Sequence, residues 1–168
     1  MIRKKKRYAR PKRIYEKVRI LEENKIMANY ALKNKTEIWK TDAKINYYRS
    51  RAKELAKKSS EEQKVLFDRL TALGIKVSSI ADVLALKIEN LLERRLPTIV
   101  VKKGLAKTSK QARQMVTHKH ILINGNVVNT PGYIVPVSEE NSISLRKPSK
   151  KPKENIAEIK EEKIMENK

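Results

Sequence analysis

The stretch from Arg94 to Val128 constrains the fold most, because the spacing of its apolar residues changes from helical to strand-like within a few positions. Residues 109–117 have a helical period, in which Ala112, Met115 and Val116 share one face. The opposite face carries Lys110, Arg113, Gln114 and Thr117. The pattern predicts an amphipathic helix whose polar face is basic.

A tight hairpin is predicted directly after this helix. Residues 121–123 and 127–128 are apolar and flank Asn124-Gly125, the dipeptide most favoured in a type I′ turn. The turn is a sufficient explanation for this dipeptide. A basic helix that leads into a hairpin is a compact way to present Lys and Arg side chains to a phosphate backbone.

The charge of the chain points to a polyanionic partner. Its 168 residues include 40 Lys and Arg against 19 Asp and Glu, which gives a formal net charge of +21. Such a charge opposes folding by self-repulsion unless a polyanion neutralises it. Nucleic acid is the usual partner, and an anionic membrane is the competitor. With one Trp and one Phe, the chain is a poor candidate for stacking single-stranded bases, so folded RNA fits better.

Other classes of function have little support in the sequence. The absence of cysteine excludes disulfides and thiolate zinc sites, and no apolar run approaches the roughly 20 residues of a transmembrane helix. The basic beginning of the chain lacks the apolar core of a secretory signal. GLAKTSK at 104–110 lacks the spacing of a phosphate-binding loop, and no catalytic arrangement is evident. We therefore expect no enzyme activity, no cofactor, no metal and no small-molecule substrate.

Four regions are expected along the chain. Two basic blocks flank a nearly neutral one, which we interpret as a helical packing layer. The regions are a basic arm at 1–13, a helical N-terminal region at 14–92, an RNA-binding module at 93–147 and a flexible charged tail at 148–168. The predicted fold class is α+β: the helical N-terminal region packs on a small module of two helices and a short antiparallel sheet.

The helices of the N-terminal region are placed by their apolar spacing and their capping residues. A first helix at about 14–28 is expected to pack through Ile14, Val18 and Leu21. Asn34 with Glu37 resembles a capping box at the start of the next helix, and Ser59 or Ser60 begins another that ends near Gly74. Residues 82–93 are predicted to be mostly helical, and Pro97 to occupy the first turn of the following helix. Residues 133–135 and 143–145 are predicted strands.

Cations gather around the predicted module. Arg94 and Arg95 end one predicted helix, and Lys102 and Lys103 end the next. Each alone is explained by the preference for positive charge at a helix C-terminus. As a group that converges on Lys107, Lys110 and Arg113 they favour a phosphate site, because converging like charges cost stability without an anion.

Arg113 and the two histidines each have a second interpretation. Arg113 is either a solvated surface residue or a phosphate ligand; its polar-face neighbours are all donors with no acid among them, which favours the ligand. His118 and His120 lack companion ligands, so contact with RNA or solvent is favoured over a metal site.

The basic arm is expected to be disordered until RNA neutralises it. It is also compatible with a localisation signal or a solubilising tail, but Tyr8 among its cations favours RNA, since Tyr can stack on bases or bind phosphate. The complete set of predicted RNA-binding residues is Arg3, Lys4, Lys5, Lys6, Arg7, Tyr8, Arg10, Lys12, Arg13, Lys33, Lys35, Arg94, Arg95, Lys102, Lys103, Lys107, Lys110, Arg113, Gln114, Lys119 and His120.

The chain resembles the family of small-subunit ribosomal protein S4, in its archaeal and eukaryotic type. In the module the resemblance is carried by Ser-x-x-Ala-Arg-Gln at 109–114 and Ile-Asn-Gly at 123–125. This pair of motifs also occurs in RNA-modifying enzymes and a tyrosyl-tRNA synthetase that carry the module as an appendage. LKNKTEIWK at 32–40 together with LERRLPT at 92–98 is much more specific. The similarity covers roughly residues 8–147.

The resemblance implies a structural constituent of the small ribosomal subunit that works in the cytoplasm, in the ribosome. Family members bind ribosomal RNA directly, nucleate assembly and line the messenger entry region, where they contribute to translational accuracy. The implied partners are small-subunit ribosomal RNA and neighbouring ribosomal proteins, including protein five. Some members hold zinc through cysteines near the N-terminus; this chain has no cysteine, so no zinc is implied.

Three rival interpretations stay open. The first is a related assembly factor that acts on precursor ribosomal RNA with similar chemistry. The second is an enzyme with this module as an appendage, which the short chain disfavours. The third is a protein of the lipid surface, which would need a basic amphipathic helix with bulky apolar residues opposite, and residues 1–13 lack them.

Overall fold

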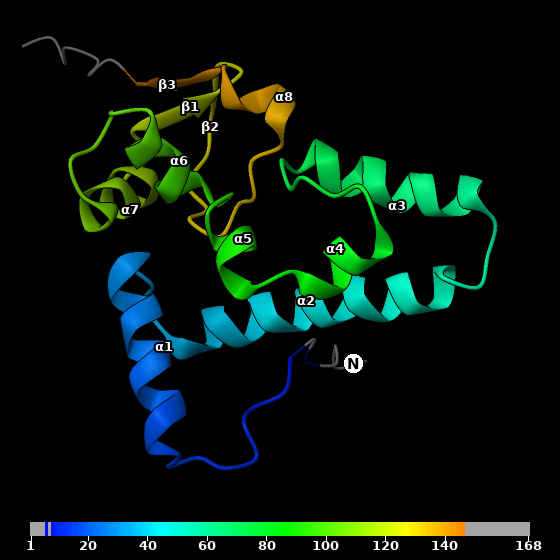
Figure 1. The fold of residues 1–168 in the computed structure, drawn as a ribbon. Helices are drawn as coiled ribbons and strands as arrows, with labels where there is room; N and C mark the ends of the chain where they lie inside the picture. The colour runs from blue at the N-terminus through cyan, green and yellow to red at the C-terminus, as the bar shows by residue number, and fades with distance from the viewer. Residues whose placement is uncertain (1–5, 7, 147–168) are drawn as a thin grey trace, which may run out of the picture.

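The computed structural model describes residue 6 and residues 8–146, in two packed parts (Figure 1). Seven helices precede the small antiparallel sheet and a short eighth lies between its second and third strands among the described residues, so the predicted α+β class is confirmed. The helices are α1 (Lys17–Asn29), α2 (Lys35–Leu55), α3 (Ser60–Ala72), α4 (Ile80–Ala85), α5 (Ile88–Leu92), α6 (Leu96–Lys102), α7 (Ser109–Thr117) and α8 (Val137–Glu140), and the strands are β1 (Ile121–Ile123), β2 (Asn126–Val127) and β3 (Ile143–Leu145). The predicted tail at 148–168 and most of the predicted arm's first seven residues lie outside the described residues.

The C-terminal part is built around one apolar layer between two helices and a sheet. Helices α6 and α7 pack on a three-stranded antiparallel sheet with strand order β2-β1-β3. Val116 of α7 and Ile121 of β1 are fully buried in this layer, and Met115 is partly buried against it. Asn124 and Gly125 both have positive φ, at 51° and 79°, as a type I′ turn requires. The predicted amphipathic helix and hairpin are therefore both confirmed.

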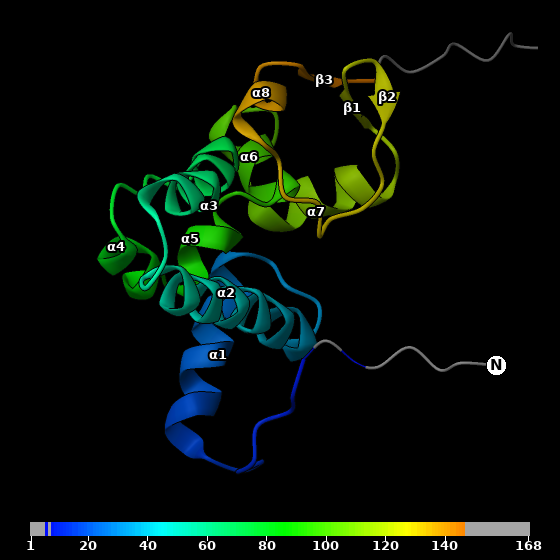
Figure 2. The same cartoon turned by 90° about the vertical axis from the view of Figure 1, so that its right-hand side faces the viewer.

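The N-terminal part is organised by the long helix α2. Its residues Ile45, Ala52 and Leu55 are buried against α3 and α4. Helix α1 packs near the start of α2 and projects from the rest of the molecule, as both views show (Figures 1 and 2). The helical region thus meets the C-terminal part at the N-terminal end of α2 and at α5.

The predicted packing stripe of the first helix is wrong. Ile14, Val18 and Leu21 are 68%, 66% and 53% exposed. Helix α1 instead packs through Ile26 and Met27, on the opposite side and nearer its C-terminal end. The heptad-like spacing of the first three residues is real, but nothing among the described residues covers them.

Two other predictions differ from the structure. The predicted helix at 82–93 is split, because Leu86 is extended (ψ 132°) with its side chain buried and its carbonyl accepting a hydrogen bond from Arg49 at 2.7 Å. Residues 133–135 form no strand. Instead Ile134 makes an isolated bridge with Arg95, which ties the end of the helical region to the sheet side of the module.

Helix α3 ends as predicted, at Gly74, where both the backbone conformation and the space available disfavour a side chain. Gly74 has φ +78°, and the amides of Gly74 and Ile75 bond the carbonyls of Thr71 and Leu70 in the pattern of a Schellman cap. An added Cβ would lie 2.7 Å from Cζ of Arg94. The same cap closes α6 at Gly104 (φ +72°), where an added Cβ would meet nothing within 4 Å.

Gly74→Ala is therefore expected to lower the free energy of unfolding by more than Gly104→Ala. Both variants carry the cost of about 1 kcal/mol for a left-handed alanine. Only Gly74→Ala also displaces the Arg94 side chain, which is held by other hydrogen bonds. The free energy of unfolding should therefore fall by about 2–4 kcal/mol in Gly74→Ala. Urea unfolding of the free proteins measures both losses, and equal losses would contradict the packing of Arg94 on Gly74.

Candidate nucleic-acid interface

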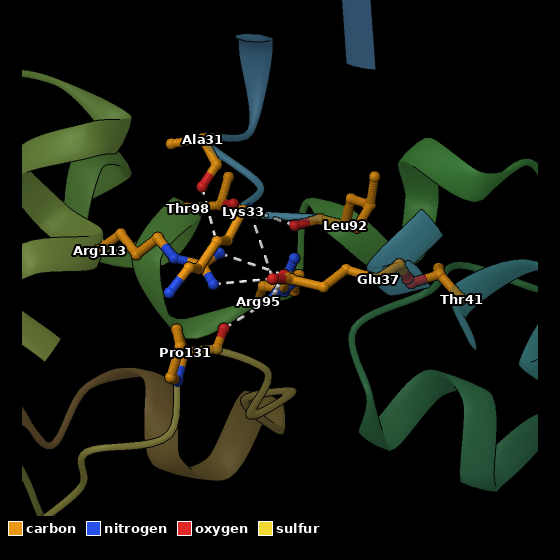
Figure 3. A network of polar contacts seen from close by, with 9 residues as sticks. All are labelled: Ala31, Lys33, Glu37, Thr41, Leu92, Arg95, Thr98, Arg113 and Pro131. Carbon is orange, nitrogen blue, oxygen red and sulfur yellow. Dashed lines mark hydrogen bonds and ion pairs between the residues drawn. The ribbon is translucent and has the colours of Figure 1, made fainter. Parts of the chain in front are cut away.

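The carboxylate of Glu37, near the start of α2, lies at the centre of a polar network that joins the two parts of the molecule (Figure 3). Its Oε2 accepts a hydrogen bond from Nη2 of Arg95 at 2.6 Å. Arg113 of α7 donates to both oxygens, with Nη2 2.7 Å from Oε1 and Nη1 3.1 Å from Oε2. Arg113 also donates to the carbonyl of Ala31, and Arg95 to that of Pro131. The carboxylate therefore clamps α2, α7 and the segment before α6 together.

The charge of Glu37 is strongly favoured in this setting. Burial alone would raise the pKa of the Glu37 carboxyl, but hydrogen bonds from Arg113 and Arg95, together with their charges, lower it to about 2. The carboxylate stays ionised at neutral pH and neutralises much of the charge of both arginines from within the protein.

The expectation that Arg113 has no acid nearby is therefore wrong. The polar face of α7 holds no acid of its own, but α2 brings Glu37 to it across the fold. Arg95 is only 8% exposed and lies in the same clamp. Their guanidinium groups hold the fold together through Glu37. A direct contact with RNA, as predicted for both residues, would have to be made by the N–H groups that do not bond to the protein.

Other cations predicted to converge as an unpaired group also have acidic partners. Arg94 lies 2.9 Å from Glu140 and donates to the carbonyl of Val135. Lys102 pairs with Glu93 at 3.1 Å. Lys35, a predicted RNA-binding residue outside that group, pairs with Glu23 at the same distance. The argument that these charges need an external anion does not hold, because the fold supplies carboxylates. Lys103 is half-buried at the end of α6.

The remaining predicted side chains are exposed, and some of them meet across the two parts. Those exposed among the described residues are Lys6, Arg10, Lys12, Arg13, Lys33, Lys107, Lys110, Gln114, Lys119 and His120. Lys33, which follows α1, lines one hollow of about 390 Å³ with Lys110 and Gln114 of α7. We call this hollow the α7 groove. Residues 77 or more positions apart in the sequence thus present donors to one concave surface.

Local bonds hold the start of α7 in place at this groove. The hydroxyl of Thr108 caps the helix by accepting from the amide of Gln111 at 3.2 Å, and the Gln111 side chain accepts from the amide of Lys107 at 3.0 Å. Ser109 donates to the carbonyl of Asn29 at the end of α1. These bonds fix the backbone from which the side chains of Lys107 and Lys110 project.

A second basic hollow was missed by the sequence reasoning. Lys40 and Lys44 of α2 line a space of about 350 Å³ with the turn at 130–132, beside Glu37. The signal was present: these lysines are four residues apart on a helix, where like charges repel unless an anion compensates them. They extend the basic surface along α2, and Arg113 lines both this hollow and the α7 groove.

The arm is partly engaged with the protein, so the expectation of an arm without contacts is wrong for Tyr8. Its ring centre lies 6.4 Å from that of Trp39, and Nζ of Lys40 lies 5.7 Å from the centre of the Tyr8 ring. Arg3, Lys4, Lys5 and Arg7 of the predicted set lie outside the described residues. The backbone carbonyls of Arg13 and Ile14 accept from Arg19, which fastens the arm's end to α1.

The two histidines lie side by side at the end of α7. His118 caps the helix and is followed by Lys119 in a left-handed conformation, and the two imidazole rings stack with centres 6.4 Å apart. Within the part of the chain that the structure describes, no group of three or more His, Cys, Asp or Glu residues is placed to hold a metal ion. Nor is any described helix long and apolar enough to cross a membrane.

Comparisons with known proteins show which family the chain is similar to. The family model of the S4 domain matches residues 94–141. The chain is 47% identical to the small ribosomal subunit protein uS4 of Ignicoccus hospitalis, across 82% of this chain and 87% of that protein. It is 45% identical to uS4 of Methanosphaerula palustris, with 83% of each chain covered, and 44% identical to uS4 of Thermoplasma volcanium, with 83% and 74% covered.

The clamp predicts a loss of stability in acid. Because the folded pKa of Glu37 lies below its ordinary value of 4.5, its contribution is complete above about pH 5 and is lost as pH falls towards 2. Glu37→Gln should lower the free energy of unfolding by about 2–3 kcal/mol at pH 6, and by much less at pH 2.5. Denaturant unfolding at both values measures this difference.

Two features sharpen this test. Asp82, whose pKa is lowered to about 2 by hydrogen bonds from the Ser78 backbone and side chain and from Ser79, titrates in both proteins and cancels in the comparison. Glu62→Gln is the matched control, since its exposed carboxylate pairs with Lys58 one turn away and should contribute at most about 0.5 kcal/mol. A loss at Glu37 that does not change with pH would refute the clamp.

Proposed function

The chain belongs to the uS4 family of small ribosomal subunit proteins, and we propose that it binds small-subunit ribosomal RNA directly and nucleates assembly of the subunit. Its coarser role, as a structural protein of the small subunit, follows from the family. The observation that supports direct binding best is the α7 groove, where Lys33 of the helical region and Lys110 of the S4 domain line one hollow.

The mechanism follows from how the groove is built. Exposed Lys and Arg side chains neutralise phosphates, and the clamp at Glu37 fixes the angle between the groups that each part presents. A-form RNA helices are recognised mostly through their shape and backbone, so the spacing of cations is what selects a site. We propose that the protein binds where RNA helices converge, with the helical region at 14–92 on one helix and the module at 93–147 on another.

The remaining parts of the proposal concern the setting. We propose that the protein works in the cytoplasm, lies in the messenger entry region of the small subunit beside protein five, and contributes there to translational accuracy. Stable sedimentation with mature small subunits at moderate salt is the expected behaviour. Association with precursor particles alone would instead assign the chain to the assembly factors that resemble this family.

We expect RNA binding by this protein to depend steeply on salt. The net charge of +21 and the scarcity of aromatic residues favour phosphate contacts over base stacking. If about eight phosphates are neutralised, log K should fall with log salt concentration at a slope of roughly −6 to −7. Filter binding to a transcript of the five-prime domain, over about 0.05 to 0.3 M KCl, measures the slope. A slope near zero would refute the electrostatic mechanism.

Single charge removals locate the interface. Lys33→Gln and Lys110→Gln should each reduce the salt slope by about 1 and weaken binding about four- to fivefold at about 0.15 M salt, because one counterion fewer is released. Lys64→Gln, on the exposed side of α3, is the matched control and should have little effect. If Lys64→Gln weakens binding as much as the other two, the α7 groove is not the interface and only the net charge matters.

A further inference from the structure

A hollow larger than the α7 groove lies between the end of the arm, α1 and the start of α2. Its volume is about 650 Å³, within the range of roughly 300–1,000 Å³ that is typical of sites for small organic groups. Figures 1 and 2 show the arm turning back from the start of α1 towards α2. We call this space the arm hollow. Its apolar walls are formed by Pro11, Ile14, Tyr15, Ile20, Met27 and Trp39.

The charged side chains that line the arm hollow are all cations. Arg19 and Lys35 are already bonded to the carboxylate of Glu23, at 2.7 and 3.1 Å. Arg10 and Lys33 also line the hollow and are exposed. No ion pair among the described residues neutralises Lys33, so its ammonium group is open to an anion.

The arm hollow adjoins the surface proposed to bind RNA. Met27 and Lys33 line both the arm hollow and the α7 groove. At Arg10 and Trp39, by contrast, it adjoins a smaller hollow that Glu22 and Asp42 line, where an anion is disfavoured. The charged part of a ligand is therefore expected at Lys33, and its apolar part against the walls further in.

A single buried carboxylate holds these walls together before any ligand binds. Glu23 is 6% exposed, and its Oε1 accepts hydrogen bonds from Nε1 of Trp39 at 3.0 Å and from Nη1 of Arg19 at 2.7 Å. Arg19 also donates to the carbonyls of Arg13 and Ile14 in the arm, at 2.8 and 2.9 Å. Glu23 thus connects α1, α2 and the arm, and a preformed site loses less free energy to ordering when its ligand binds.

Two side-chain amides add hydrogen-bonding groups to the apolar walls. Asn24 of α1 and Asn34 before α2 both line the arm hollow and are exposed. The capping box expected at Asn34 and Glu37 does not form, because Asn34 makes no side-chain cap bond and Glu37 bonds the arginines of the clamp. Each amide offers donors and an acceptor, as the edge of a nucleic-acid base does.

We propose that the arm hollow takes up one unpaired nucleotide of the RNA, with its base against the apolar walls and its phosphate at Lys33. A nucleotide combines a flat face that can be buried, a polar edge and an anion one sugar away, and bases outside a helix are the ones that proteins read. This inference rests on the proposed function and deepens it. It adds recognition of one base to the recognition of backbone and shape.

A removable block tests the proposal, because the chain has no cysteine of its own. Asn24→Cys places a thiol at the arm hollow, and alkylation with N-cyclohexylmaleimide then fills the space with an aliphatic group that cannot stack on a base. Val65→Cys, at a position 69% exposed on α3, receives the same reagent as the matched control. Each protein is compared before and after alkylation, bound to a transcript of the five-prime domain.

Base-specific chemical modification of the transcript locates the nucleotide. We expect the bound protein to protect one unpaired base, and alkylated Asn24→Cys to lose that protection while the rest of the footprint persists. Affinity should fall about five- to hundredfold on alkylation of Asn24→Cys, the range that loss of one stacked base gives, and hardly at all on alkylation of Val65→Cys. A transcript that lacks only this base should bind the unblocked protein as weakly as the intact transcript binds the blocked one. Blocking should have little further effect on it.

Trp39 gives a second measurement that needs no variant. It is the only Trp of the chain and lines the arm hollow, so contact with a base should quench its fluorescence. We expect quenching by the intact transcript and much less by the transcript that lacks the protected base. Saturation of the same signal by micromolar free nucleoside monophosphates would overturn the proposal and assign the hollow to a soluble nucleotide.

The contrary results are distinct from one another. An unchanged affinity and footprint after alkylation of Asn24→Cys would overturn the proposal. A loss of affinity on blocking that is the same with and without the base would overturn it in favour of a phosphate contact alone. Normal RNA binding by the blocked protein, with failure to enter complete subunits, would assign the hollow to a peptide. If the unchanged protein does not bind small-subunit ribosomal RNA at all, the proposed function itself is refuted, and this inference with it.

Discussion

The carboxylate of Glu37 is the contact on which the arrangement of this protein depends. Two arginines from the C-terminal side, Arg95 and Arg113, converge on it from a chain distance of 58 and 76 residues. A charge this poorly solvated is stable only when its partners are in place. Removal of one partner leaves the other charge partly buried without compensation, which destabilises the folded protein. The clamp therefore ties the conformation of the S4 domain to that of the helical region, and the two together carry the proposed interface.

The arginines of the network and the lysines of the α7 groove differ in their surroundings. Arg94, Arg95 and Arg113 turn inward to carboxylates and backbone carbonyls, where the planar guanidinium group makes several bonds at once. Lysines such as Lys33, Lys107 and Lys110 stay exposed, where a flexible ammonium group can follow a phosphate backbone. These arginines stabilise the fold, and these lysines supply much of the charge on its surface. The large net charge is thus compatible with a folded protein.

The sequence predicts most of the local structure and less of the site. The helix at 109–117, the hairpin at Asn124-Gly125 and the glycine cap at Gly74 depend on neighbours in the chain, so their patterns are sufficient. Whether Arg113 faces solvent or a carboxylate depends on Glu37, 76 residues away, and no local pattern on α7 reveals that pairing. The prediction that Ile14, Val18 and Leu21 pack inside the protein was wrong for a related reason. Amphipathic spacing shows that a helix face is apolar, but not whether the rest of the chain covers that face.

The central claim is that the clamp orients the two RNA-binding parts. The most direct test is the affinity of the Glu37→Gln protein for ribosomal RNA. This change removes a negative charge, so electrostatics alone would strengthen binding to a polyanion. The clamp account predicts the opposite sign: affinity for the five-prime domain should fall at conditions where the variant is folded, while Glu62→Gln binds as well as the unchanged protein or slightly better. A Glu37→Gln protein that is folded and binds more tightly would contradict the account.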